Sequence, residues 1–181
     1  MDTYSAPSHQ KLIGALWPAD EPEALRTWAI LDAAREPRVL EELEYTLHDK
    51  HCLFAGQLSP ALQNAAPYLI QIDSGDRFTQ SLLQYGWGQA WGIFFRTRAW
   101  VDPLRKHFRT FLRVRDYRGK YLLFRYYDPR VLRAYLPTCL PDELSAVFGP
   151  VHSFLLEAQD SNTVLRYRFD GQKLVQSAIS L

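Results

Sequence analysis

Three aspartates each follow an apolar run that the sequence predicts to be a strand. Asp32 ends RTWAILD, Asp73 ends PYLIQID, and Asp128 follows YLLFRYY. If such strands are parallel neighbours, their carboxyl ends meet at one edge of a sheet, where ligands and catalytic groups gather in open α/β folds. Carboxylates at such an edge can hold Mg²⁺ and support phosphoryl transfer. One hypothesis is therefore a small α/β enzyme that uses magnesium to act on a phosphorylated ligand.

Each of these aspartates also has a structural explanation. Asp128 precedes Pro129, and this pair is typical of the N-cap and first position of a helix. Asp73 precedes a turn. Asp32 can pair with Arg125, whose guanidinium lies among aromatic and aliphatic residues and needs a carboxylate or carbonyl partner when it is buried. We favour these explanations, and we expect no enzymatic activity.

Other signatures of catalysis or cofactor binding are weak. Gly86, Gly88 and Gly92 lack the spacing of the dinucleotide fingerprint and run into a strand instead of a helix, so we expect a loop of small residues. The His-x-x-His-Cys sequence at 48–52 has no second pair at metal-ligand spacing. The sequence therefore predicts neither a metal site nor a cofactor.

Positive charge is concentrated in one part of the chain. Residues 96–133 contain twelve basic and three acidic side chains, although the whole chain has a net charge of only +1. Arg105, Arg109 and Arg113 recur at four-residue spacing on a predicted amphipathic helix over 102–115, whose apolar stripe is expected to face inward. These three arginines are candidates for binding a partner.

The basic segment allows three explanations. It can be a solvated helix face, it can bind an acidic protein surface, or it can bind nucleic acid, since aromatic residues alternate with basic ones from Trp100 to Tyr127. However, Phe108, Phe111 and Phe124 fall on faces that we expect to point inward. Among the binding explanations we therefore favour an acidic protein over a nucleic acid.

The stretch 120–136 predicts a strand, an abrupt turn and a helix. As far as Tyr127, successive side chains alternate between two faces, as they do in a strand, and Arg125 lies on one of these faces. The Asp-Pro pair then begins the helix. Arg130 and Arg133 lie on the predicted exposed side of that helix. They are therefore further candidates for contacting a partner.

The order of the predicted elements favours an α/β fold. Strands alternate with helices over the first half of the chain, which is typical of a mostly parallel central sheet flanked by helices, and a C-terminal antiparallel hairpin follows. The predicted strands are 26–32, 51–55, 67–73, 91–96, 120–127, 151–157 and 163–169, and the predicted helices are 9–16, 37–47, a short one near 59–60, 78–85, 102–115, one from 129 and one from 141.

Composition indicates a folded cytoplasmic protein. The 181 residues are 47% hydrophobic and 14% aromatic, which argues against disorder and suits one domain with an ordinary core. The N-terminal sequence lacks the pattern of a signal peptide, and no run of about 18 apolar residues could anchor the chain in a membrane. Cys52 and Cys139 lie in apolar settings, so we expect buried thiols and a reducing compartment.

Several motifs occur in an order that is characteristic of one family. The most specific is the block 104–151, in which FRYYDPR and later FGP follow a basic helix. The other motifs are TWAILDAAR at 27–35, CLFAG at 52–56, APYLIQI at 66–72 and WGIFFRT at 91–97. Over roughly residues 26–151, the chain thus resembles the type VI secretion effector chaperones, or adaptors, known as domain of unknown function 4123.

This resemblance implies a non-enzymatic cytoplasmic adaptor. Members hold a toxic effector, often through its N-terminal or membrane-inserting region, and help to load it onto the valine-glycine-repeat spike protein. The resemblance divides the chain into an N-terminal helical extension (1–25), an α/β adaptor domain (26–151) and a C-terminal hairpin and tail (152–181), the remnant of a second lobe in longer members. Residue by residue, the family pattern is matched by Asp32, Arg125, Tyr127, Asp128, Pro129 and Arg130. Of these, we expect Arg125 and Asp128 to fix the fold.

Overall fold

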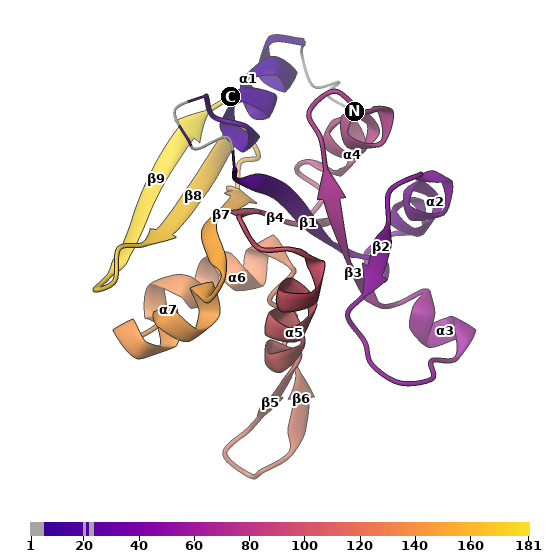
Figure 1. Ribbon diagram of the computed structural model, residues 1–181, viewed down its shortest axis with the longest axis vertical. Helices are drawn as coiled ribbons and strands as arrows, with labels where there is room; N and C mark the ends of the chain where they lie inside the picture. Colours follow the sequence, from indigo (N-terminus) through magenta and orange to yellow (C-terminus); the bar gives the residue numbers. More distant parts are fainter. Residues whose placement is uncertain (1–5, 20, 22–23) are drawn as a thin grey trace.

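A seven-stranded sheet forms the centre of the computed structural model, which describes residues 6–19, 21 and 24–181 (Figure 1). The strands of this sheet lie in the order β2-β3-β1-β4-β7-β8-β9, and β5 and β6 form a separate two-stranded sheet. The strands are β1 (Arg26–Asp32), β2 (Lys50–Cys52), β3 (Pro67–Ile72), β4 (Gly92–Thr97), β5 (Arg113–Arg115), β6 (Tyr121–Leu123), β7 (Val151–Glu157), β8 (Thr163–Phe169) and β9 (Leu174–Ser180). The helices are α1 (Ala6–Leu16), α2 (Pro37–Tyr45), α3 (Pro60–Gln63), α4 (Arg77–Gly86), α5 (Val101–Phe111), α6 (Pro129–Tyr135), the short 3₁₀ helix η1 (Leu136–Thr138) and α7 (Pro141–Phe148).

Every strand pair among the described residues is antiparallel, so the prediction of a mostly parallel sheet is wrong. The reason lies in the strand order. β1 and β2 run in the same direction and are connected through α2, but β3 lies between them and runs the opposite way. Likewise β3 and β4, connected through α4, run in the same direction on either side of β1. The alternation of strands and helices in the sequence indicates such crossovers. It does not reveal that an antiparallel strand lies between the two strands that each crossover connects.

Helices cover both faces of the central sheet. On one face, α1, α2 and α4 contribute buried side chains that include Leu16, Leu43 and Leu82. On the other face, α5 and α6 contribute Phe108 and Leu132, together with residues of α7. Successive residues of β1 alternate between these two cores, as the period of a strand requires. Within the described part of the chain, no helix combines the length and the apolar composition that crossing a bilayer demands.

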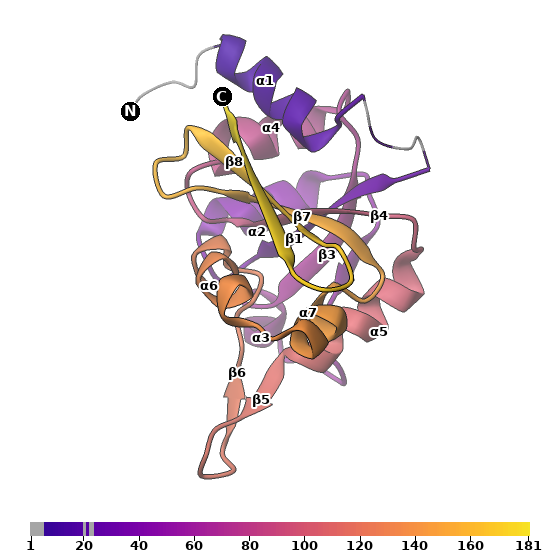
Figure 2. The same ribbon diagram turned by 90° about the vertical axis from the view of Figure 1, so that its left-hand side faces the viewer.

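The region after α5 differs from the sequence-based prediction. α5 ends at Phe111 and does not continue to residue 115, because the next residues form β5 and pair with β6. The strand predicted to reach Tyr127 is therefore shorter than expected. It is observed as β6, which ends at Leu123 and lies in a small hairpin outside the central sheet. Figure 2 shows this β5–β6 hairpin projecting away from the rest of the molecule.

A tight turn closes the β5–β6 hairpin. Asp116 Oδ1 accepts hydrogen bonds from the backbone N–H groups of Arg118 and Lys120, each at 2.9 Å. Gly119 has a φ of +78°, which is accessible to glycine at little cost. The turn sequence therefore reverses the direction of the chain, and the helix predicted before it ends.

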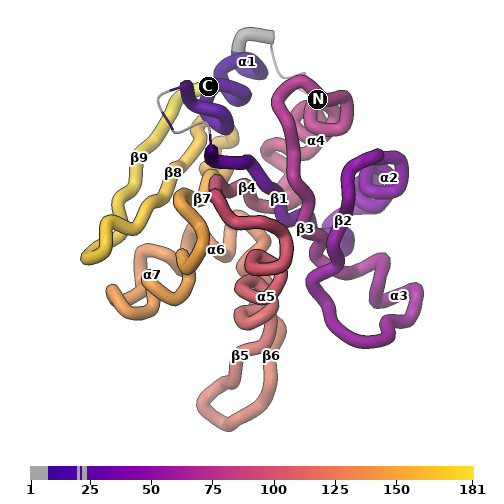
Figure 3. Tube along the Cα trace, in the orientation of Figure 1, coloured from indigo at the N-terminus to yellow at the C-terminus, as the bar shows by residue number. Residues whose placement is uncertain are grey.

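The C-terminal strands extend the central sheet. β7 pairs with β4 on one side and with β8 on the other, so the predicted hairpin of β7 and β8 is present. A further strand, β9, which the sequence analysis does not predict, pairs with β8 along its whole length. Figure 3 shows the end of the chain lying beside α1, where Arg166 donates a hydrogen bond to the Ala15 carbonyl at 3.2 Å.

Candidate partner-binding surface

The carboxyl end of β1 carries the ion pair that the sequence predicts. Arg125 Nη2 donates a hydrogen bond to Asp32 Oδ2, and Asp32 Oδ1 accepts one from the Ala34 N–H at 3.1 Å. The Asp32 side chain is only 1% exposed, whereas the Arg125 side chain is 43% exposed. The buried member of the pair is thus the carboxylate, and Arg125 covers it from the solvent side.

Asp128 begins α6 in the predicted way, with Pro129 in the first turn. Its Oδ1 accepts hydrogen bonds from the Arg130 backbone N–H and from Arg130 Nε, each at 2.9 Å. Burial alone would raise the pKa of Asp128, but these hydrogen bonds and the Arg130 charge outweigh it and hold the pKa below its ordinary value. Next to Asp128, burial and the nearby charge of Asp32 raise the pKa of Tyr127 to about 12. Asp32, Tyr127 and Asp128 thus fix the junction between the end of β1 and α6. Asp128 also occupies much of the hydrogen-bonding capacity of Arg130.

Arg133 holds α6 against the end of β7. Its Nη1 donates a hydrogen bond to the Glu157 carbonyl at 2.7 Å. The Glu157 side chain accepts hydrogen bonds from the backbone N–H groups of Gly88 at 2.6 Å and Ala90 at 3.0 Å. Burial nevertheless raises the pKa of Glu157 above its usual value. Arg133 is therefore less available to a partner than its predicted exposed position suggests.

The three aspartates of the enzymatic hypothesis do not meet. In the antiparallel register, Asp32 is opposite Pro67, so Asp73, which directly follows β3, lies at the other end of the sheet, roughly 20 Å away. Asp73 is also exposed. Among the described residues, no group of three or more His, Cys, Asp or Glu side chains is arranged to hold a metal ion. The antiparallel order thus removes the geometric basis of the proposed magnesium site.

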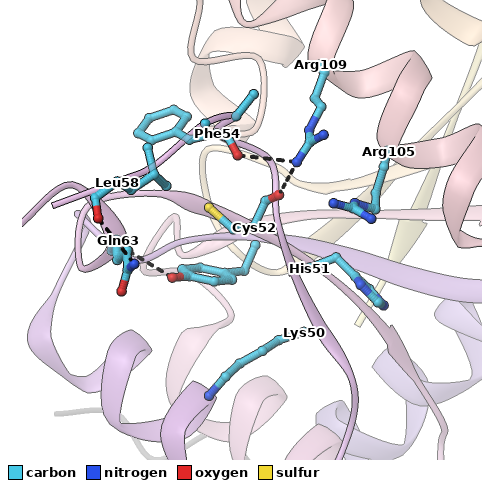
Figure 4. Close-up of a pocket in the computed structure, with 11 residues that line it drawn as sticks. Lys50, His51, Cys52, Phe54, Leu58, Gln63, Arg105 and Arg109 are labelled. Carbon is cyan, nitrogen blue, oxygen red and sulfur yellow. Dashed lines mark hydrogen bonds between the residues drawn. The ribbon is translucent and has the colours of Figure 1, made fainter. Parts of the chain in front are cut away.

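Arg105 and Arg109 extend from α5 over an open pocket of about 540 Å³ beside β2 (Figure 4). We call this the β2–α5 pocket. It is lined by Lys50, His51, Cys52, Phe54, Ala55, Gly56, Leu58, Gln63, Tyr68, Arg105 and Arg109. None of these described lining residues is acidic, so the lining carries a net positive charge.

The two arginines of the β2–α5 pocket have different surroundings. Arg109 donates hydrogen bonds to the carbonyls of Leu53 (3.1 Å), Cys52 (3.0 Å) and Phe54 (3.3 Å), and so it fastens the chain after β2 to α5. Arg105 makes only a distant ion pair, 3.8 Å from an Asp102 carboxylate that is 87% exposed. Its Nε is buried and has no hydrogen-bond partner among the described residues. Of the two, Arg105 is therefore the one that can still bind a ligand.

His51 lies in the positive field of this pocket. Burial, and next the charge of Arg105, lower the pKa of His51 below its ordinary value of 6.5, although Asp49 and Asp102 oppose the shift. The imidazole is therefore mainly neutral at pH 7 and can donate one hydrogen bond.

The β5–β6 hairpin exposes large apolar side chains together with basic ones. Four of its apolar residues are at least 44% exposed, and Val114 is 39% exposed. The four are Tyr117 (89%), Tyr121 (50%), Leu122 (44%) and Leu123 (50%). An exposed apolar patch bordered by charge is typical of an interaction surface.

The register of the hairpin separates these side chains into two faces. Arg113 and Arg115 lie opposite Leu123 and Tyr121, and their guanidinium carbons are 4.3 and 4.6 Å from the centre of the Tyr121 ring. The other face carries the pair of Val114 and Leu122. Arg113 therefore lies on a strand and not on the predicted helix. One face of the hairpin carries both arginines with Tyr121 and Leu123, while the other face carries only aliphatic residues of this register.

The comparisons with known proteins give one match. Residues 27–146, more than half of the chain, match the family model described as Domain of unknown function (DUF4123). The chain belongs to the DUF4123 family. This family is linked to type VI secretion effector adaptors. No curated protein and no solved structure matches the chain.

The DUF4123 match spans the β1–α6 junction, the β2–α5 pocket and the hairpin, and it ends within α7. The sequence does not mark Tyr117 or Leu122 as contact residues, although the Asp and Gly of the DYRG turn are typical of a chain reversal between strands. The pocket is not predictable from the sequence either, because local periodicity cannot show that β2 and α5 come together. In this DUF4123 protein, the accessible features suited to a partner are therefore the hairpin and the pocket.

Proposed function

We propose that this chain is a cytoplasmic adaptor that binds a type VI secretion effector and helps to load it onto the valine-glycine-repeat spike protein. The observation that carries the proposal is membership of DUF4123 over residues 27–146, because that family is linked to effector adaptors of this secretion system. The partners in this proposal are the toxic effector and the spike protein. Neither nucleic acid nor a cofactor has a part in it, and the chain is not an enzyme.

The β5–β6 hairpin is the effector-contacting surface in this proposal. A two-stranded ribbon is marginally stable by itself in water, and here Phe124 and Tyr126 anchor its base to the core around Phe108. The rest of the hairpin exposes apolar area that a partner can bury without disturbing that core. Four basic side chains surround this area, so an effector surface with an apolar centre and an acidic rim is complementary to it.

The five arginines predicted to contact a partner differ in accessibility. Arg113 lies on the hairpin and is the best placed to meet the effector. Arg105 faces the β2–α5 pocket. By contrast, Arg109, Arg130 and Arg133 already bind carbonyl or carboxylate oxygens of the chain itself. We therefore assign effector contact to Arg113 and a mainly structural role to the last three.

Co-purification tests this proposal. The chain is co-expressed with the toxin and the spike protein encoded beside its gene, and the mixture is separated by size-exclusion chromatography with light scattering. We expect the chain to elute with the toxin. The double variant Tyr117→Ala/Leu122→Ser should weaken this complex, while Arg77→Gln on the far side of the sheet should not.

Two results would contradict the proposal. One is that the chain elutes alone beside both proteins and does not change the solubility of the toxin. The other is tight binding of DNA or RNA that weakens steeply with salt, since this behaviour marks contacts to nucleic-acid phosphates.

A further inference from the structure

The β2–α5 pocket has the volume of a ligand-binding site. Its volume of about 540 Å³ falls within the range of roughly 300–1,000 Å³ that is usual for ligand sites. Arg105 and Arg109 lie above it, β2 forms its base, and the segment after β2 forms a side wall with Phe54 and Leu58 (Figure 4). The pocket thus combines positive charge with an apolar wall.

The charge of Arg105 is incompletely compensated within the chain. Its Nε is buried without a hydrogen-bond partner among the described residues, and its ion pair with Asp102 is long and open to water. A buried Nε is shielded from a ligand, so an acceptor in the open pocket would bind the terminal Nη groups of Arg105, whose contact among the described residues is the long ion pair with Asp102. Lys50 contributes less, because its Nζ already donates to the Leu43 carbonyl and its side chain points away from the arginines in Figure 4.

The position of β2 suits an extended ligand. β2 is an edge strand that pairs only with β3 in the described sheet, and all three of its residues line the pocket. Edge strands commonly receive extended peptide segments, with pockets reading the side chains. The planar guanidinium of Arg105 beside such a segment is matched to a carboxylate, which it can bind through two hydrogen bonds.

We propose that the β2–α5 pocket binds a carboxylate of an extended effector segment, with Arg105 as the pairing residue and the Phe54–Leu58 wall contacting an adjacent apolar side chain. The identification of the effector as the source of this segment rests on the proposed adaptor function. The carboxylate belongs to an Asp or Glu side chain or to a chain terminus, and the two sources are separated by experiment.

An NMR titration of the full chain tests the site without the effector. Three peptides serve as probes: Leu-Glu-Leu blocked at both ends, Leu-Gln-Leu blocked at both ends, and Leu-Gln-Leu with a free carboxyl terminus. Inorganic phosphate is a fourth probe. The reporters are the Arg105 Nε–H resonance, the His51 ring and the backbone amides of residues 50–56. We expect saturable shifts with at least one carboxylate peptide, at an affinity at least tenfold above that of the neutral peptide.

Variants connect this binding to Arg105. Arg105→Gln should lower the affinity for the carboxylate peptide by about tenfold, and Arg105→Lys, which keeps the charge but loses the planar fork, should give an intermediate affinity. Arg77→Gln is the matched control, because it removes one positive charge from α4 on the other face of the sheet. Thermal unfolding of each variant shows whether it is folded.

Three results would overturn the inference: equal binding of the neutral peptide, unchanged binding by folded Arg105→Gln and Arg105→Lys, or phosphate binding more tightly than either carboxylate peptide. Failure here, with the toxin still co-eluting, would refute the carboxylate site but leave the adaptor function. Peptide binding without toxin co-elution would refute the adaptor function and leave the site.

Discussion

Removal of Arg125 should destabilise the fold before it affects partner binding. In Arg125→Ala, the buried Asp32 carboxylate loses its ion-pair partner and keeps only the 3.1 Å hydrogen bond from the Ala34 N–H. Loss of one member of a fully buried pair costs about 3–5 kcal/mol. Because the Arg125 side chain is 43% exposed, water can partly replace it, and we expect a loss of about 2–3 kcal/mol in the free energy of unfolding. For a chain of this size, this loss lowers the Tm by about 4–12 °C.

Urea and thermal unfolding, followed by tryptophan fluorescence and circular dichroism, measure this loss. Arg77→Ala, which removes an exposed arginine on α4, should unfold like the wild type. In a double-mutant cycle with Asp32→Asn, the combined loss should be smaller than the sum of the two single losses, because both changes remove the same interaction. An Arg125→Ala variant with wild-type stability would refute the reasoning, and if it also lost the effector, Arg125 would be reassigned to the interface.

Three further predictions follow from single contacts. Gly149→Ala should lower the free energy of unfolding by about 1–3 kcal/mol, because Gly149 has a φ of +43° and a Cβ there would lie 2.6 Å from Cε1 of His107. Chemical denaturation measures this loss, and a variant as stable as the wild type would contradict the prediction. Burial raises the pKa of Glu157 above its ordinary 4.5, so the folded state holds the proton at higher pH than the unfolded chain does. The free energy of unfolding should therefore increase as pH falls through the raised pKa towards 4.5. This contribution should be absent from the stability–pH profile of Glu157→Gln, and a profile identical to that of the wild type would count against it. Leu122→Ser should change the free energy of unfolding by less than about 0.5 kcal/mol, because the side chain is exposed on the hairpin, and a cooperative loss of several degrees in Tm would show that it packs in the core.

Local rules predicted many of the elements but not how they pair. The capping pair before α6 and the glycine after α7 mark helix ends, because they act within one turn of the chain. The direction of each strand depends on which strands become neighbours, and periodicity carries no such information. The helix predicted to reach residue 115 failed for a related reason, since Leu112 continues the apolar stripe of α5 although the chain has already turned towards β5.

The candidate site was predictable from the sequence only where a buried charged residue requires a partner of opposite charge. The pairing of Arg125 with Asp32 follows from the cost of an unpaired buried charge, although the sequence could not show that the carboxylate is the buried member. The β2–α5 pocket arises from tertiary contacts between segments about fifty residues apart. The exposure of the hairpin likewise becomes visible only when the core is known, because its tyrosines and leucines are of the same types that fill that core.

Hydrogen–deuterium exchange of the chain, alone and mixed with the toxin encoded beside its gene, tests the adaptor proposal most directly. The proposal predicts that amides of residues 113–123 in the β5–β6 hairpin exchange more slowly in the mixture, while those of α4 are unchanged. A mixture in which no segment gains protection, or a stable complex in which the hairpin exchanges as fast as in the free chain, would contradict it.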